Sequence, residues 1–545
     1  MAVAVAVLFI VLAIYLPGNG GAGVTLPWNL TFTAWTGMML IVLACRYKST
    51  SARGESQPLI TLGGILLLLP WLLQARGNPG VWTLLAALLL WQLLMRIPLT
   101  TVRRQQILWA VFILALGQAG IGLLQTFSPS IAARLYEFNW LRNHGRPYGI
   151  FQQVNLMASF LAIGIACGFL LLMKSGSRAA RLIVPGLGLL AFVMALNQSR
   201  AGAMGAVISV IAISWLVGRN HPLRMWAGVM IMILAACAGV HITQHITVLV
   251  NGQPSLIARD YTGSTRERLY ILEITWKMIQ AHPWTGYGYG TFEYAFSRYV
   301  LTHPETGYSY SSIVNHPHNE LLYAWFQGGV IALAGMLALC VGWLVILIRA
   351  ARQSHYDLAQ SLLILPLLVH INLEYPLYQS FVHFGLLLIL LRLGVADIPS
   401  PASTVQVLPL RQRAICALCG TAMFIFSLTG LYAGQKLTAL ERSGLVNFPV
   451  PAPWYFTTQS ERAQFDGMVA LLTDYNLTRN SANLDAFMVQ AEKWSERYND
   501  KNVWRSMITI AQHRNETEKL AEMKEMYRQL FPQKTEQQPS IPPEH

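Results

Sequence analysis

Long runs of apolar residues, separated by short polar segments, dominate the chain as far as about residue 435. Each run is close to the roughly 17–25 residues that an α-helix needs to cross the hydrocarbon core of a bilayer. Only helices and closed barrels satisfy the backbone inside a membrane, and the sequence lacks the short alternating segments of a barrel. The pattern therefore predicts an all-α, polytopic membrane protein with about thirteen transmembrane helices. These are expected at 2–16, 31–45, 58–74, 80–95, 106–127, 154–173, 182–198, 201–217, 225–241, 321–348, 358–373, 377–391 and 414–434.

The polar segments divide the chain into four expected parts. Residues 1–241 predict an N-terminal membrane bundle of about nine spans, and residues 319–435 predict a second bundle of about four spans. Between the bundles lies a long polar loop, 242–318, and after them comes a polar, helical tail, 436–545.

The tail contains two helix-like stretches, at 484–498 and 503–530. The residues after Phe531 are rich in Pro and Gln, a composition that predicts disorder. Three apolar side chains of the tail are expected to face a small core: Trp494, Trp504 and Met507.

Lys and Arg residues indicate how the chain crosses the membrane. Because no Lys or Arg precedes the run at 2–16, this run is expected to be a retained span and not a cleaved signal peptide. With the N-terminus in the cytoplasm, most basic loop residues fall on the cytoplasmic side, as expected for the inner membrane of a bacterium. The loop and the tail then face the periplasm. The cytoplasmic loops hold Arg46, Lys48, Arg53, Arg96, Arg103, Arg104, Lys174, Arg178, Arg181, Arg219, Arg224, Arg349, Arg352, Arg392, Arg411 and Arg413, and the short opposite connections hold Arg76, Arg134, Arg142, Arg146 and Arg200.

Charge and cysteine content argue against two further classes of protein. The net charge of +14 belongs to the membrane part, since charges in the tail nearly balance. We interpret this excess as a topological signal and not as a nucleic-acid-binding surface. The six cysteines lie in or beside apolar runs, and the Cys416-x-x-Cys419 pair has no second pair or His nearby. They fit small packing residues, so we predict no metal-binding or redox role for them.

Four polar clusters fall on the outer side of the membrane in this topology. They lie at 145–155, at 197–202, in the loop 242–318 and at 374–376. Polar groups at membrane depth are costly and are therefore often functional. Their convergence on one face predicts a site at the outer surface.

The residue types in these clusters favour chemistry on an anionic, lipid-linked substrate. The planar, permanently charged fork of Arg suits phosphate, so two Arg from distant segments fit a diphosphate leaving group. A His near neutral pKa can take a proton from a hydroxyl nucleophile, and amides and phenols can orient the substrates. The clusters lack the paired carboxylates of a glycoside hydrolase. The candidate catalytic residues are His318, Arg200 and Arg268, and the candidate substrate-binding residues are Gln153, Asn155, Tyr375, Asn319, Glu374, His316 and Arg266.

Each candidate also has a structural interpretation. Arg200 fits a helix-end residue that extends to the interface, and Arg268 fits a surface residue paired with a neighbouring Glu. The His316-x-His318 pair fits the polar cap of a span, and 374–376 fits a turn whose Pro starts the next span. The glycine-rich stretch at 286–290 follows no strand, so it predicts a turn and not a phosphate-binding loop.

The motif His318-Asn319, followed after nine residues by Gly329, resembles the His-Asn-x9-Gly pattern of the O-antigen ligase and polymerase superfamily. Ala332 stands where family members often have Gly, Thr or Tyr. The segment 197–202 is similar to the Ser-Arg motif of that family. The segment from Arg268 to Gly288 is similar to its Arg…Pro-x-x-Gly-x-Gly loop.

Two further motifs resemble PglL-type protein O-oligosaccharyltransferases. The segment 146–155 is similar to their Gln-Pro-Asn region, with Val154 in the place of Pro. The segment 370–377 is similar to their Glu-Tyr-Pro-Leu region, and the polar tail also fits these proteins.

The resemblance implies an activity. It implies transfer of a glycan en bloc from a polyprenyl (undecaprenyl) diphosphate carrier to a Ser or Thr hydroxyl of an exported protein such as a type IV pilin. The expected partners are therefore the carrier-linked glycan, a periplasmic acceptor protein and membrane lipids, with no nucleic acid, and no metal or nucleotide cofactor is implied.

Three other functions remain open at this point. An O-antigen ligase acting on lipid A–core and an O-antigen polymerase share the same chemistry and differ only in their acceptor. A transporter or flippase for the carrier lipid belongs to another class. A flippase needs residues that are accessible from both faces, whereas the candidates here gather on one.

Overall fold

The computed structural model describes residues 19–46, 48–49, 52–74, 79–257, 264–306, 313–399, 406–407 and 409–531, together with Leu8, Leu12, Tyr15 and Leu16. The span expected at 2–16 lies outside the described residues, apart from Leu8, Leu12, Tyr15 and Leu16. The disorder expected after Phe531 lies outside them as well.

Helices occupy the apolar runs that the sequence predicts, which confirms an all-α, polytopic membrane protein. The number of spans stays a prediction. Seven of the described helices are long and apolar enough to cross a membrane: α2 (Pro27–Arg46), α5 (Thr101–Phe127), α8 (Val154–Lys174), α9 (Ser177–Asn197), α11 (Pro222–His245), α14 (Glu320–Gln353) and α18 (Leu410–Arg442). Shorter apolar helices are α3 (Pro58–Gln74), α4 (Pro79–Arg96), α10 (Arg200–Leu216), α15 (His355–Ser361), α16 (Leu365–Ile371) and α17 (Phe381–Leu393).

Helix α8 is the centre of the larger bundle. Its membrane-length window is completely buried, and it packs against α5, α9 and α10. A helix that is apolar on all sides is suited to such a position. Gly164 lies against Ala115, and Gly168 lies against the ring of Phe112, so both glycines allow α5 to approach closely. Because α8 is held on all sides, the polar residues at its N-terminal end have fixed positions.

The span expected at 358–373 is divided into two short helices. A turn at 362–364 separates α15 from α16, and Pro366 lies in the first turn of α16. Pro lacks a backbone N–H and is tolerated in the first turn of a helix, where that group has no partner. The next span likewise begins with a short 3-10 helix, η4 (Pro376–Tyr378), before α17. The segment 372–375 between these elements is therefore free of regular structure.

Buried Arg side chains tie α4, α5 and α17 together at one end of the bundle. Arg392 is 1% exposed, pairs with Asp397, and donates to the carbonyl oxygens of Leu94 (2.9 Å) and Ile97 (2.8 Å). Arg104 reaches the same Asp397 at 3.4 Å. Short two-stranded pairings lie beside this cluster: β1 (Lys48–Ser49) with β6 (Gln406–Val407), and β2 (Ala52–Gly54) with β5 (Asp397–Pro399).

Two short helices, α6 (Pro129–Tyr136) and α7 (Trp140–Asn143), connect α5 to α8. They share an apolar cluster with the hairpin of β3 (Thr247–Val250) and β4 (Gln253–Leu256), which follows α11. The remaining 3-10 turns near the bundle are η1 (Gly23–Thr25) and η2 (Gly218–Asn220). The start of the polar loop is thus held against the segment that leads into α8.

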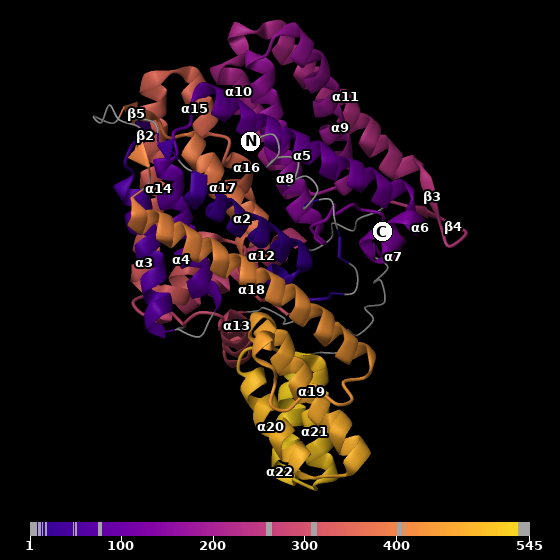
Figure 1. Cartoon of the computed structure of the whole chain (residues 1–545). Helices are drawn as coiled ribbons and strands as arrows, with labels where there is room; N and C mark the ends of the chain where they lie inside the picture. The colour runs from indigo at the N-terminus through magenta and orange to yellow at the C-terminus, as the bar shows by residue number, and fades with distance from the viewer. Residues whose placement is uncertain are drawn as a thin grey trace.

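The loop and the tail share one hydrophobic core. The loop contains α12 (Ser264–Ala281), α13 (Phe292–Thr302) and η3 (Pro304–Thr306). The tail contains η5 (Trp454–Gln459), α19 (Ser460–Thr478), α20 (Ala482–Ser495), α21 (Lys501–His513) and α22 (Thr517–Leu530), which Figure 1 shows grouped beyond the end of α18, next to α13.

Details of the tail differ from the sequence prediction in two ways. The stretch expected at 503–530 forms two helices, because Asn515 adopts a left-handed conformation (φ 57°) that ends α21. Trp504 and Met507 are buried in this core and Trp494 packs against it, but the core also contains Ile274 and Phe296 of the loop.

Hydrogen bonds reinforce this contact between loop and tail. The backbone N–H of Asn499 donates to the Glu293 carboxylate (2.6 Å), and the Asn499 amide donates to the Ser297 hydroxyl (3.1 Å). The tail therefore packs firmly on the loop that leads to α14.

Helix α14 contains a kink at Gly329, where φ is 60° and ψ is −154°. The glycine-rich turn 286–290 fits against this kink. The N–H groups of Tyr287 and Gly288 donate to the carbonyl oxygens of Phe326 (2.7 Å) and Gln327 (3.1 Å), and Val330 N–H donates to Trp284 (3.2 Å). The prediction of a turn at 286–290 is correct, and its hydrogen bonds fix the loop to the start of α14.

Replacing Gly329 with Ala should destabilise this junction. The backbone conformation at Gly329 is essentially restricted to glycine, and a Cβ atom there would collide with the Trp284 carbonyl. We expect a loss of about 1–3 kcal/mol or more, measured as a lower thermal unfolding temperature in detergent. Gly120→Ala is the control, because a Cβ at that position in α5 meets nothing within 4 Å. Equal unfolding temperatures for the two variants would contradict the role of the kink.

Candidate active site

The carboxylate of Glu374 is the meeting point of three distant segments. Glu374 lies in the irregular stretch between α16 and η4 and is buried. Its Oε1 accepts hydrogen bonds from Asn155 Nδ2 and from Arg268 Nη2 (3.3 Å). Its Oε2 accepts from Gln153 Nε2 (3.4 Å) and lies 3.5 Å from His370 Nε2. The start of α8, the start of α12 and the end of α16 are joined through this one side chain.

Glu374 remains ionised across the physiological range. Burial alone would raise the pKa of its carboxyl group, but the nearby His370, the hydrogen bond from Asn155 and the charge of Arg268 outweigh burial. Together they lower the pKa of Glu374 to about 2. The site therefore contains a permanent negative charge that holds one edge of the Arg268 guanidinium.

A second set of hydrogen bonds fixes the segment that precedes α8. Ser199 donates to Asn155 Oδ1 (2.8 Å), and the buried amide of Asn197 donates to the carbonyl oxygens of Pro147 (2.8 Å) and Val154 (3.0 Å). The sequence motifs at 145–155 and 197–202 thus form one unit. Arg200 follows Ser199 directly as the first residue of α10, with an exposed side chain.

His318 lies next to Glu374 in space. Its Nδ1 is 2.9 Å from the carbonyl oxygen of Leu373, the residue before Glu374. A carbonyl oxygen can only accept, so Nδ1 carries the ring proton and Nε2 keeps a free lone pair. Burial, Arg268 and His316 lower the pKa of His318 below its ordinary 6.5. The ring is therefore neutral at pH 7, with Nε2 able to accept a proton.

The structure brings most of the candidate residues together, but Arg266 is separate. Arg266 is exposed and contacts Tyr270 (3.3 Å) on its own helix, α12. Residues two apart on a helix point in different directions, so Arg266 does not accompany Arg268 into the cluster. Its role in substrate binding stays a prediction.

Two other candidates have contacts that serve the fold. Asn319 is the N-cap of α14: its Oδ1 accepts from Leu322 N–H (3.0 Å), and its amide donates to Asn372 (3.2 Å). Tyr375 lies against the ring of His316, with 4.8 Å between ring centroids. Both residues therefore position the segment around His318, in addition to any contact with substrate.

The sequence did not predict individual roles for three residues that support this cluster, which are His370, Ser159 and Ser199. His370 lies four positions before Glu374 on α16 and contacts the Ser159 hydroxyl at 2.8 Å. Ser199 was part of a motif, but its bond to Asn155 depends on the fold. The i,i+4 spacing of His370 and Glu374 was the one signal available in the sequence.

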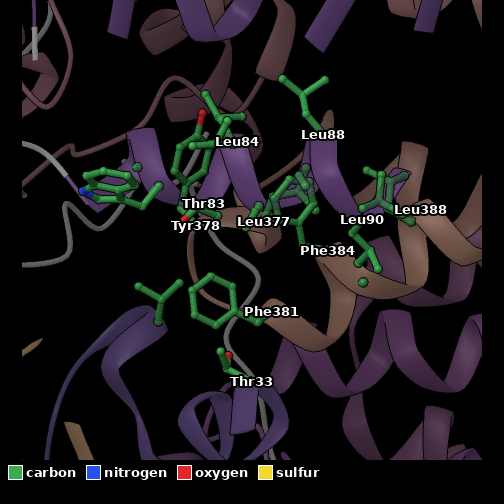
Figure 2. Close-up of a pocket in the computed structure, with 18 of the residues that line it drawn as sticks. Thr33, Thr83, Leu84, Leu88, Leu90, Leu377, Tyr378, Phe381, Phe384 and Leu388 are labelled. Atoms are coloured by element: carbon green, nitrogen blue, oxygen red, sulfur yellow. The ribbon is translucent and has the colours of Figure 1, made fainter. Parts of the chain in front are cut away.

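A large apolar cavity opens beside the cluster. It has a volume of about 3280 Å³ and is lined by α2, α3, α4, α14, α17 and α18. Figure 2 labels Tyr378, Phe381 and Phe384, together with Leu84 and Leu88 of α4, among the residues that line it. Asn319 and Glu320 also line the cavity, so it reaches the residues that follow His318.

Comparison with known proteins gives consistent matches along the chain. A family described as O-antigen ligase matches residues 185–337, which contain Arg200, Arg268 and His318. A family described as protein glycosylation ligase matches 147–172. A family described as virulence factor membrane-bound polymerase, C-terminal, matches 358–543.

In three separate regions the chain is therefore similar to O-antigen ligases, protein glycosylation ligases and membrane-bound polymerases. A general O-oligosaccharyltransferase of Acinetobacter baylyi is also similar, with 25% identity over 273 residues. The aligned region is 48% of this chain and 46% of that protein, so the match spans about half the length of the relative. The resemblance seen in the sequence motifs is thereby confirmed.

Replacing Glu374 with Gln should destabilise the cluster, because the amide removes the charge that holds Arg268. Since Arg268 is partly exposed, we expect a modest loss of about 1–2 kcal/mol, seen as a lower unfolding temperature at pH 7. Glu305→Gln, at an exposed carboxylate of the same loop, is the matched control.

The pH dependence gives this comparison a second readout. A carboxyl group whose pKa is lowered by folding stabilises the folded state. This stabilisation is fully present at pH values above the pKa of the group in the unfolded chain, 4.5, and is lost as the pH falls through its pKa in the folded protein, about 2. The difference in unfolding temperature between wild type and Glu374→Gln should therefore stay constant from about pH 8 to about pH 5. If this difference in unfolding temperature disappeared near neutral pH, Glu374 would not be ionised in the folded protein.

Proposed function

We propose that the protein is an oligosaccharyltransferase that moves a glycan en bloc from a polyprenyl diphosphate carrier to Ser or Thr hydroxyls of exported proteins. The observation that carries this proposal is the combination of a neutral His318 and a Glu374-held Arg268 with a large apolar cavity, whose lining includes Asn319 next to His318 in the chain. The relative from Acinetobacter baylyi, described as a general O-oligosaccharyltransferase, supports the same activity.

The apolar cavity fits the polyprenyl chain of the carrier. Its lining from α2, α4 and α17 is almost entirely hydrophobic, as a binding site for an isoprenoid requires. The cavity extends to Asn319, so a chain bound there would leave its diphosphate near the polar cluster. This arrangement corresponds to an enzyme of the bacterial inner membrane whose site faces the periplasm, as the distribution of Lys and Arg predicts.

Two Arg residues are proposed to bind the diphosphate. Glu374 contacts one Nη of Arg268, which leaves other N–H groups of the fork for phosphate oxygens. Arg200, at the start of α10 beside the Ser199–Asn155 bond, supplies the second charge. Their positive charge stabilises the negative charge that develops when the diphosphate departs.

His318 is proposed as the general base. Nε2 accepts the proton of the Ser or Thr hydroxyl, whose oxygen forms a new bond to the anomeric carbon. The bond between that carbon and the diphosphate oxygen breaks, and the diphosphate leaves with the electron pair. In-line displacement inverts the anomeric configuration. The imidazolium then releases its proton, which restores the neutral His318.

The remaining candidates are proposed to position the substrates. Gln153 and Asn155 both donate to Glu374 and so align its carboxylate with Arg268. Burial raises the pKa of the Tyr375 phenol above its ordinary value, so Tyr375 stays protonated and can donate to a sugar or to the acceptor.

A polymerase that extends the glycan on its carrier is the second candidate function. The match of residues 358–543 to a membrane-bound polymerase family favours it. A ligase acting on lipid A–core uses the same chemistry. The acceptor distinguishes the three functions, and a pilin is one acceptor to test among exported proteins.

Replacing His318 with Ala should reduce transfer by about 10²–10⁴-fold, the usual contribution of a general base. Purified protein is mixed with polyprenyl-diphosphate glycan and a Ser-containing periplasmic protein, and the added glycan mass is measured. His241→Ala, at an exposed His on α11, is the control with normal transfer. Normal transfer by His318→Ala would exclude His318 as the base. Glycan added to lipid A–core or to the carrier in place of protein would exclude the proposed acceptor.

The rate of transfer should fall as pH decreases through the pKa of His318. Because that pKa lies below 6.5, more than half of the maximal rate should remain at pH 6.5. A profile of kcat against pH at saturating substrates measures this directly. A half-maximal point above pH 6.5 would contradict a buried, neutral base.

A further inference from the structure

His318 has an unusual backbone conformation for a non-glycine residue, with φ at 61°. This left-handed conformation is unfavourable for a bulky side chain and requires support from the surroundings. The support comes from His316: the backbone N–H of His318 donates to His316 Nδ1 at 2.8 Å. The imidazole thus acts here as Asn or Asp side chains do when they accept from a backbone N–H two residues later.

The same hydrogen bond fixes the tautomer of His316. Nδ1 is an acceptor, so in the neutral ring the proton is on Nε2. Nε2 lies 3.6 Å from Glu320 Oε2, and neither of these buried atoms has a hydrogen-bond partner, so the contact between them is electrostatic. The other carboxylate oxygen of Glu320 accepts from the Tyr378 hydroxyl at 2.7 Å.

Packing leaves His316 little freedom to rotate. The side chain is 2% exposed, and its ring centroid lies 4.4 Å from that of Tyr323 and 4.8 Å from that of Tyr375. Tyr378 closes the same pocket at 6.3 Å. The imidazole is therefore held by aromatic rings on several sides and by one polar contact at each nitrogen.

These contacts form a relay that ends at the base. Tyr378 of η4 orients Glu320, Glu320 orients His316, and His316 sets the turn from which the His318 side chain projects. The turn brings His318 Nδ1 within 2.9 Å of Leu373 and determines where Nε2 points. Enzymes lose much of their rate when a reacting group is misplaced by about 1 Å.

We propose that His316, together with Glu320 and Tyr378, is a positioning relay for the His318 base and does not itself bind substrate. This rests on the proposed function of His318, and it replaces the sequence-based expectation that His316 contacts substrate. A positioning role lowers kcat when it is lost and leaves the KM values for carrier and acceptor unchanged.

Two substitutions at position 316 distinguish the contribution of the hydrogen bond from the contribution of the volume of the ring. In His316→Asn, the side-chain oxygen replaces Nδ1 as the acceptor for the His318 N–H, whereas His316→Leu fills similar space without an acceptor. We expect His316→Leu to lower kcat by about 10–100-fold with unchanged KM, and His316→Asn, which restores the acceptor but not the contact with Glu320, to recover part of the rate. A raised KM with normal kcat in His316→Leu would assign the residue to substrate binding and overturn the relay.

Tyr378→Phe provides the test if His316→Leu does not fold, since it removes only the hydroxyl that orients Glu320. It should lower kcat without changing the KM for the acceptor, and an unchanged kcat would remove Tyr378 from the relay. Thermal unfolding of each variant excludes a loss of activity through loss of the fold.

A readout that does not depend on transfer distinguishes failure of the relay from failure of the proposed function. Diethyl pyrocarbonate modifies unprotonated imidazole nitrogens, and mass spectrometry measures the rate at His318 in each variant. We expect wild type and His316→Asn to react alike and His316→Leu to differ. Equal rates in all three would overturn the relay even if wild type transfers glycan. If wild type transfers to no acceptor, the proposed function fails, and the modification rates alone decide the relay.

Discussion

The ionised carboxylate of Glu374 is the interaction on which the site depends. A buried negative charge is tolerated only when hydrogen-bond donors and positive charges surround it. Here the donors come from the start of α8, from α12 and from α16, which are far apart in the sequence. The carboxylate of Glu374 therefore has all of its hydrogen-bond donors only when both membrane bundles and the loop are in their native arrangement.

Hydrophobic patterning predicts most of the helices because each apolar run must satisfy its backbone within the membrane. It also predicts that polar residues from distant segments gather at one membrane face, because polar side chains surrounded by lipid and apolar helices mainly contact each other. These residues are Gln153, Asn155, Arg268, His318 and Glu374. It does not predict the break between α15 and α16 or the kink at Gly329, because both depend on local backbone geometry and on contacts with the loop. The positioning role that we propose for His316 could not be predicted for the same reason, since it follows from the left-handed turn at His318.

The shared core of loop and tail gives the site a second anchor. Sequence patterning predicted a small core within the tail, because amphipathic helices do not reveal which partner covers their apolar face. In the fold, Met507 of α21 packs in the same cluster as Phe296 of α13, and Asn499 bonds to Glu293 and Ser297. The loop that carries Arg268 is consequently fixed from the tail, from the kink of α14 and from Glu374.

The central proposal is that Arg268, held by Glu374, binds a diphosphate while His318 Nε2 faces the acceptor hydroxyl. An experimental structure of the protein with a bound polyprenyl diphosphate tests this most directly. The account predicts phosphate oxygens within hydrogen-bonding distance of Arg268 and Arg200, and the prenyl chain in the cavity lined by α2, α4 and α17. A diphosphate bound away from Arg268, for example beside the Arg residues at the opposite end of the bundle, would contradict it.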